Sequence, residues 1–314
     1  MSAVVNVALP VFAIILAGFL AGRFRLLGDL ASEALNKFVY YFALPPVVFL
    51  GMARRPLDEI LNWPFIASFL GAMMAVYLLA WALGWALHRE PPEILSLQAL
   101  NASFANTGYM GIPLFLTAFG EAGLAPAILA TVILSAVGVG LAVVVLELCR
   151  SAGGGMAKAL RDVGTALLRN PLVMATALGL AVSVAHLPIP DPVVNLGNLL
   201  GAAAGPCALF AIGLFLAGRP LSADLAEIGW ITALKLIWQP LLTWILAFQV
   251  FMLDPYWARS AVILAALPTG ALTFVIAQQY RTYVERTSAV ILVSTVLSVL
   301  TLSAILAAYG PEAG

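Results

Sequence analysis

Long apolar runs return along the whole length of this 314-residue chain, and they restrict what it can fold into. A run of about 20 apolar residues can span the hydrocarbon core of a bilayer as a helix. Every backbone N–H and C=O inside the bilayer needs a partner, and a helix supplies these partners within itself. Only 10% of the residues are charged, whereas about a quarter are charged in soluble domains. We therefore predict an all-α polytopic membrane protein.

The apolar runs predict ten transmembrane helices that are joined by short connections. The expected spans are 4–22, 32–51, 63–87, 95–118, 124–149, 171–187, 194–217, 229–252, 257–279 and 285–308. The longest connection is 151–170, and its later part has apolar residues on one helical face and charged residues elsewhere. We expect an interfacial helix in this linker, and we expect the linker to be cytoplasmic.

Most of the Lys and Arg residues outside the spans lie in the odd-numbered connections. Cytoplasmic loops of membrane proteins carry an excess of these residues. We therefore expect a multi-pass membrane protein with cytoplasmic odd-numbered connections and both termini outside. The formal net charge is +0, which argues against nucleic acid as a partner and leaves the lipid bilayer as the expected surroundings.

The two halves of the chain resemble each other when the sequence is shifted by about 162 residues. At that shift the stretch 106–108 meets 268–270, and at 161 Gly18 meets Gly179. We interpret 1–150 and 171–314 as two five-helix repeats. Because five is an odd number, the second repeat enters the membrane the other way up. The prediction is thus two inverted five-helix repeats.

Span 4 and span 9 are both interrupted at corresponding positions. Span 4 contains Asn106, Gly108 and Pro113, and span 9 contains Pro268 and Gly270. Gly and Pro weaken or break helices. Paired broken helices at a repeat interface are where many transporters bind their substrates. Ordinary proline kinks are the alternative interpretation.

A broken helix has a new N-terminus whose first N–H groups lack partners and carry partial positive charge. Two such ends that meet can bind an anion such as a carboxylate. The polar side chains here can cap the ends or contact the ligand, and the glycines allow close approach of the backbone. We therefore predict a substrate site formed by Asn106, Thr107, Gly108, Pro113, Pro268, Thr269 and Gly270.

Three further polar residues within the spans are candidates for the substrate path. Lys37 lies four residues after Glu33, an ion-pair spacing on a helix, and it either attracts anions or extends to the headgroups. Lys235 lies in span 8 and carries the same two interpretations. Gln278 ends span 9, where it lines an opening or marks the membrane interface. No Asp or Glu lies at the centre of any expected span, which counts against a sodium/proton antiporter.

The sequence resembles the auxin efflux carrier family in its short bacterial form. The resemblance rests on 35-LNKFVYYFALPPVVFL-50, 106-NTGYMGIPL-114, 234-LKLIWQPLL-242 and 267-LPTGALTFVIAQQYRTYVERTSAVILVSTVLS-298. It implies ten spans with a sodium/proton antiporter-like fold, in which broken helices 4 and 9 cross at their prolines. It also implies a bacterial inner membrane, with the termini on the periplasmic side, transport of small carboxylates such as malonate or malate, and a homodimer.

These observations favour a secondary active transporter of small organic anions that works by alternating access. No nucleotide-binding motif, HExxH or G-x-S-x-G occurs, so we expect neither an ATP-driven pump nor an enzyme. We expect no cofactor and no bound metal, and the coupling ion is either a proton or sodium. Two alternatives stay open: an ion-coupled symporter or antiporter of another solute, and a membrane sensor lacking transport.

Overall fold

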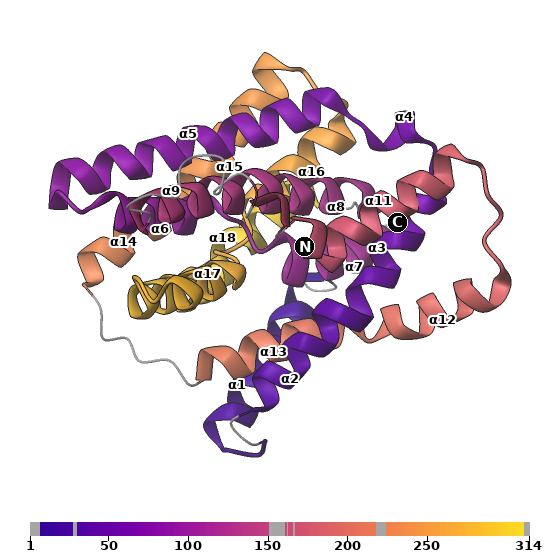
Figure 1. Ribbon diagram of the computed structural model, residues 1–314, viewed down its shortest axis with the longest axis horizontal. Helices are drawn as coiled ribbons and strands as arrows, with labels where there is room; N and C mark the ends of the chain where they lie inside the picture. Colours follow the sequence, from indigo (N-terminus) through magenta and orange to yellow (C-terminus); the bar gives the residue numbers. More distant parts are fainter. Residues whose placement is uncertain are drawn as a thin grey trace.

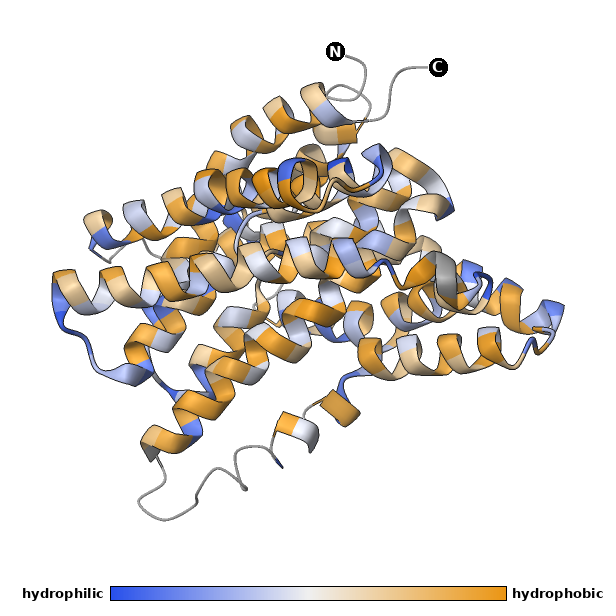
Figure 2. Ribbon diagram, turned by 90° about the horizontal axis from the view of Figure 1, so that it is seen from above, coloured by the Kyte–Doolittle hydropathy of each residue, from blue (hydrophilic) through white to orange (hydrophobic). Residues whose placement is uncertain are grey.

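The computed structural model describes residues 7–27, 30–150, 161–217 except 162 and 166, and 224–310. Within these ranges the chain is helical almost throughout, and the only strand-like feature is one isolated antiparallel bridge between Ala105 and Thr269. Most residues of the helices are hydrophobic (Figure 2). Six helices are long and apolar enough to cross a membrane, and a bent pair would make a seventh. The chain is therefore an all-helical, multi-pass membrane protein.

Six spans are fewer than the ten that the sequence predicts, because four expected spans are short or interrupted. The short helices are α1 (Leu9–Arg23) and α11 (Pro171–Val184). Spans 4 and 9 are each divided by a break. Residues 151–160 of the expected linker lie outside the described residues, and in its later part, where the interfacial helix is expected, residues 163–165 and 167–169 are helical. The ten-span arrangement stays a prediction.

The helices form two groups that lie beside each other (Figure 1). The first group contains α1, α2 (Ala31–Phe38), α3 (Leu44–Ala53), α11, α12 (Asp191–Ala202) and α13 (Ala204–Ala217). The second group contains α5 (Trp63–His88), α6 (Pro92–Ser103), α7 (Ile112–Phe119), α8 (Leu124–Ile133), α9 (Gly140–Arg150), α14 (Leu225–Ala233), α15 (Gln239–Trp244), α16 (Pro255–Ala265), α17 (Leu272–Tyr280) and α18 (Val284–Tyr309). A short helix, α4 (Leu57–Ile60), joins the groups.

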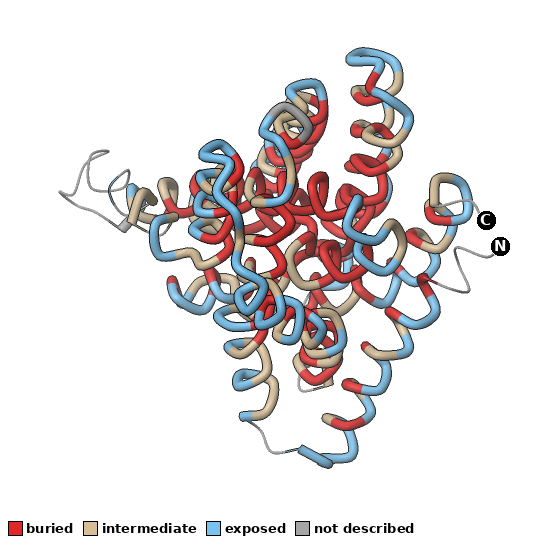
Figure 3. Tube along the Cα trace, turned by 90° about the vertical axis from the view of Figure 1, so that its right-hand side faces the viewer, coloured by how far each residue is buried: buried red, intermediate tan, exposed pale blue. Residues whose placement is uncertain are grey.

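Several of these helices contain or begin with a π-helical turn. The π-helical segments are η2 (Val39–Ala43), η3 (Thr107–Gly111), η5 (Leu134–Val139), η6 (Leu234–Trp238) and η7 (Ile245–Val250). Such turns are rare and occur often at functional sites. One of them, η3, directly follows the interruption of span 4, and η6 lies in span 8. Buried residues concentrate in the middle of the molecule (Figure 3).

Polar side chains define where four of the helices begin. Asn62, Asn170, Asp224 and Asp254 each accept backbone N–H bonds at the start of α5, α11, α14 and α16. A proline follows within the first turn of three of these helices, where its missing N–H costs nothing. These caps satisfy donors that the helix itself cannot, which matters most near or inside a bilayer.

Close backbone contact at glycines holds the first group together. Gly18 of α1 lies against the carbonyl of Phe210 in α13, and a Cβ at Gly18 would fall 2.1 Å from that oxygen. Gly179 of α11 lies in the same way against the carbonyl of Phe49 in α3, at 2.7 Å. Small residues let membrane helices approach closely, and dispersion contacts then stabilise the pair.

We expect Gly18→Ala to destabilise the protein by roughly 1–3 kcal/mol, because the added methyl group must separate α1 from the backbone of α13. Thermal unfolding of the detergent-purified protein measures this loss. The matched control is Gly229→Ala in α14, where a Cβ would meet nothing within 4 Å. Alanine favours helix over glycine, so the control should be at least as stable as wild type. Equal stability of the two variants would contradict the close packing of α1 and α13.

Candidate functional site

The interruptions of spans 4 and 9 lie against each other at the centre of the molecule. Helix α6 ends at Ser103, and the chain is non-helical until η3 begins at Thr107. Helix α16 ends at Ala265, and α17 begins at Leu272. The two gaps pair through the Ala105–Thr269 bridge. We call this paired region, residues 104–107 and 266–271, the crossing.

Two backbone hydrogen bonds join the gaps. The Asn106 N–H donates to the Pro268 carbonyl at 2.9 Å, and the Gly270 N–H donates to the Phe104 carbonyl, also at 2.9 Å. Non-helical backbone at membrane depth is tolerated only where its polar groups find partners. Each gap supplies the partners that the other gap lacks. Phe104 also packs on Gly270, where an added Cβ would lie 2.8 Å from the phenyl ring.

Side chains satisfy further carbonyls at the ends of the two first half-helices. The Thr269 hydroxyl donates to the Asn101 carbonyl at 2.8 Å, and the Gln239 amide donates to the Ser103 carbonyl at 2.8 Å. The Lys235 ammonium donates to the Ala265 carbonyl at 2.7 Å. Lys235 and Gln239 are four residues apart and therefore lie on the same face of one helix. A single turn of that helix thus donates hydrogen bonds to the C-terminal ends of both α6 and α16.

The second half-helices begin at the crossing with their N-terminal ends. The first turns of η3 and α17 have N–H groups without intrahelical partners and partial positive charge. Asn106 is the residue before η3, and its side chain does not cap that turn. It is 4% exposed and therefore buried, and Gly108 is half-buried. The hydroxyls of Thr107 and Thr131 form a hydrogen bond at 2.9 Å.

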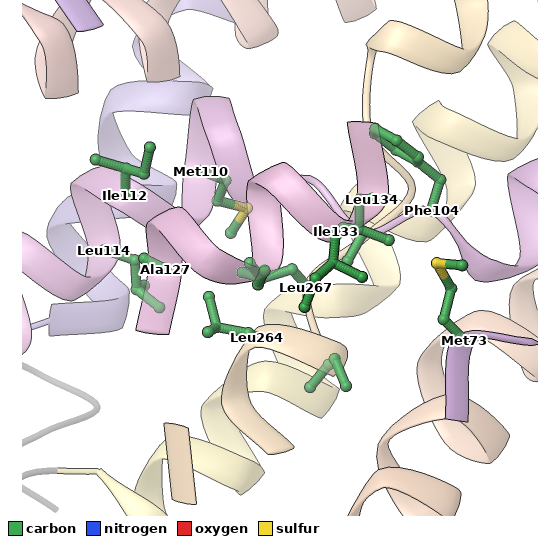
Figure 4. Packing of buried hydrophobic residues seen from close by; sticks show 14 of the residues in the cluster. Met73, Phe104, Met110, Ile112, Leu114, Ala127, Ile133, Leu134, Leu264 and Leu267 are labelled. Carbon is green, nitrogen blue, oxygen red and sulfur yellow. The ribbon is translucent and has the colours of Figure 1, made fainter. Parts of the chain in front are cut away.

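Apolar side chains surround the crossing on its other sides. In Figure 4, Leu264 and Leu267 at the end of α16 lie near Met110, Ile133 and Leu134. All five are buried. Gly111 is close to both leucines, since a Cβ there would lie 3.0 Å from Leu267 and 3.2 Å from Leu264. The polar backbone of the crossing is thus enclosed by hydrocarbon, which strengthens its electrostatic interactions.

The structure brings most of the predicted site residues together and leaves two elsewhere. Asn106, Thr107, Pro268, Thr269 and Gly270 form the crossing, and Gly108 and Pro113 follow in η3 and α7. Lys235 contacts the crossing through Ala265, and it is fully buried.

The two predicted residues outside the crossing lie on the surface of the described structure. The Lys37 side chain is 66% exposed on α2, and its ammonium lies 2.6 Å from the Glu33 carboxylate. Gln278 is exposed near the end of α17. Their part in the substrate path stays a prediction.

Sequence reasoning missed a buried carboxylate at the start of α14. Glu227 is 2% exposed, accepts hydrogen bonds from Gln98 and Tyr283, and pairs with Arg286 at 3.0 Å. Arg286 also pairs with Glu90 at 3.1 Å. The expected span 8 began at residue 229, so Glu227 fell in a loop. The pair Asp224 and Glu227 fits a capping spacing, and that signal places the helix start at Leu225.

A cavity of about 200 Å³ lies between α3, α7 and α12. Its polar lining consists of Arg54, Arg55, Glu121 and Asn198, and Leu50 is among its apolar residues. The two arginines are already engaged, because Arg54 pairs with the Glu121 carboxylate at 3.2 Å and Arg55 donates to the Glu121 carbonyl. The cavity reaches α7, the helix that continues from the crossing.

Several apolar helices around two interrupted and paired ones define a membrane transporter, and comparison with known proteins agrees. A family model described as "Membrane transport protein" matches residues 3–306. This chain is therefore a member of the auxin efflux carrier family of membrane transport proteins.

Three relatives cover nearly the whole chain. A Rhizobium meliloti (strain 1021) protein named "Putative malonate transporter" is 36% identical over 98% of this chain and 96% of its own length. "Uncharacterized transporter YfdV" of Escherichia coli (strain K12) is 26% identical over 93% of each chain. An "Uncharacterized transporter" of Methanothermobacter thermautotrophicus is 27% identical over 94% of each. These names indicate a transporter rather than an enzyme.

We expect Thr269→Val to lower the free energy of unfolding by roughly 1–3 kcal/mol, because the Asn101 carbonyl loses its hydroxyl donor in a buried site. Thermal unfolding in detergent measures the change. Thr117→Val is the matched control, since Thr117 is exposed and its hydroxyl bonds only to a carbonyl of its own helix. A Thr269 variant as stable as this control would show that the hydroxyl does not support the crossing.

Proposed function

We propose that this protein is a secondary active transporter of small organic anions, carboxylates such as malonate or malate, that works by alternating access. The observation that carries the proposal is the crossing. Two interrupted helices pair there, and the second half of each begins at the pairing. Transporters commonly bind their substrates at such interruptions.

The expected charge of the substrate follows from the helix ends at the crossing. Donors from the protein occupy carbonyls at the C-terminal ends of α6 and α16. The N-terminal ends of η3 and α17 offer N–H groups, which favour a carboxylate. The amide of Asn106 lies at the same place and can donate to a carboxylate oxygen. The relative named for malonate transport agrees with a small dicarboxylate.

The contacts in the first helix group support two inverted five-helix repeats within an antiporter-like fold. A shift of 161 residues relates Gly18 to Gly179 and also relates Phe49 to Phe210. The Gly18–Phe210 and Gly179–Phe49 contacts therefore exchange when the two halves of the chain are exchanged. A two-fold relation between the halves of the chain requires both contacts to be present, whereas chance packing does not.

The two helix groups suggest how the site alternates between the two sides of the membrane. We propose that the group with α5–α9 and α14–α18 moves against the group with α1–α3 and α11–α13, so that the crossing faces each side in turn. The proposed orientation, in a bacterial inner membrane with both termini periplasmic, is supported by the Lys and Arg distribution. We further propose a homodimer, in keeping with the family.

We expect Asn106→Ala to reduce uptake of labelled malonate into proteoliposomes by about 10-fold, because a donor at the crossing is lost. Asn106→Asp should reduce it further, since a carboxylate of similar size repels the substrate. Uptake of malonate, malate and lactate is measured with and without an imposed proton or sodium gradient.

The control is Asn195→Ala, an exposed position on α12, which should transport like wild type. Thermal unfolding confirms that each variant is folded. Folded Asn106 variants with wild-type uptake would remove Asn106 from the site. If folded wild-type protein takes up none of the three acids, the proposal for carboxylates is wrong, and another solute or a sensor becomes the better interpretation.

A further inference from the structure

The Lys235 side chain is fully buried and has no acidic partner among the described residues. Its exposure is 0%, and no described ion pair includes it. Moving a charge out of water into a protein interior is costly unless other groups compensate it. Glu227, the acidic residue nearest in sequence on the same helix, pairs with Arg286 instead.

The end of helix α16 supplies the compensation. Lys235 donates to the Ala265 carbonyl at 2.7 Å, and Ala265 is the last residue of α16. The C-terminus of a helix carries partial negative charge and carbonyls without intrahelical donors. A cation at this position is stabilised by the partial negative charge of the helix C-terminus. Without a donor, the same carbonyls would be costly in an apolar core.

Ends of this kind are where transporters with interrupted helices hold a coupling cation, because carbonyls of half-helix C-termini are good ligands for sodium. Here the neighbouring carbonyls at the crossing already have donors from the protein. The Gln239 amide donates to the Ser103 carbonyl, the Thr269 hydroxyl to the Asn101 carbonyl, and the Asn106 N–H to the Pro268 carbonyl. The Lys235 ammonium is the only charged donor in this group of donors at the crossing.

We propose that the Lys235 ammonium is a tethered cation that takes the place of a coupling sodium ion at the C-terminal end of α16. Transport of the organic anion is then independent of sodium. This inference rests on the proposed function, because it excludes sodium as the coupling ion of the proposed carrier. Lys235 is a positioning residue: it holds the end of α16 at the crossing and does not contact the substrate.

Thermal unfolding of the purified protein in sodium chloride and in choline chloride tests the inference without any transport assay. Wild type should unfold at the same temperature in both salts. Lys235→Ala should unfold roughly 5 °C lower in choline chloride, because the Ala265 carbonyl loses its donor and a cavity remains. Sodium should then restore at least half of this loss, since the emptied position can hold a small cation. Lys235→Arg, which keeps the charge, should unfold near wild type in both salts.

The second experiment measures malonate exchange in proteoliposomes. Wild-type rates should be equal with and without an inward sodium gradient, whereas Lys235→Ala should be slower and sodium should accelerate it. Asn195→Ala controls for unrelated loss. Sodium stabilisation or acceleration of wild type would overturn the inference, and so would a Lys235→Ala protein that is folded and insensitive to sodium.

The two proposals fail in distinguishable ways. If Lys235→Ala does not fold, Lys235→Gln replaces it. The wild-type protein is still compared in the two salts, and stabilisation by sodium would still overturn the inference. If wild type transports no acid, the carrier proposal fails while the unfolding arm still tests the tethered cation.

Discussion

The hydrogen bonding between two gaps in the helices is the constraint on which the rest of the structure depends. A helix interrupted in a bilayer leaves backbone donors and acceptors that lipid cannot satisfy. The pairing of Ala105 with Thr269, and the two backbone bonds beside it, remove much of that cost for both interruptions together. Neither gap could exist alone at this depth, so spans 4 and 9 are obliged to meet.

This pairing also separates charge within the crossing. The C-terminal ends of α6 and α16 receive donors from Gln239, Lys235 and Thr269, so their negative partial charge is neutralised by the protein itself. The N-terminal ends of η3 and α17 begin at the same place and receive no such acceptors from these residues. This separation supports the proposed preference of the crossing for a negatively charged substrate, because electrostatic interactions are strong in an apolar surrounding.

The sequence predicted the interruptions well because their causes are local. Gly and Pro act within a turn of where they stand, so the breaks near Asn106 and Pro268 follow from residue type alone. The contacts of Lys235 and Gln239 did not follow, because their partners come from helices distant in sequence. Glu227 was missed for a smaller reason, a helix start misplaced by four residues.

The two halves share a packing frame, but the polar chemistry at the crossing comes mostly from one of them. The glycine contacts of α1 with α13 and of α11 with α3 exchange under a single shift. A shift of 162 residues places Met73 opposite Lys235 and Tyr77 opposite Gln239. Met73 is buried and packs near Gly138, and Tyr77 bonds to Ser96 within its own half. Among the described residues, the proposed two-fold frame thus has a single charged donor at the crossing, Lys235, so its two halves differ chemically there. A carrier with such a frame can present one site to both sides of a membrane without containing two sites.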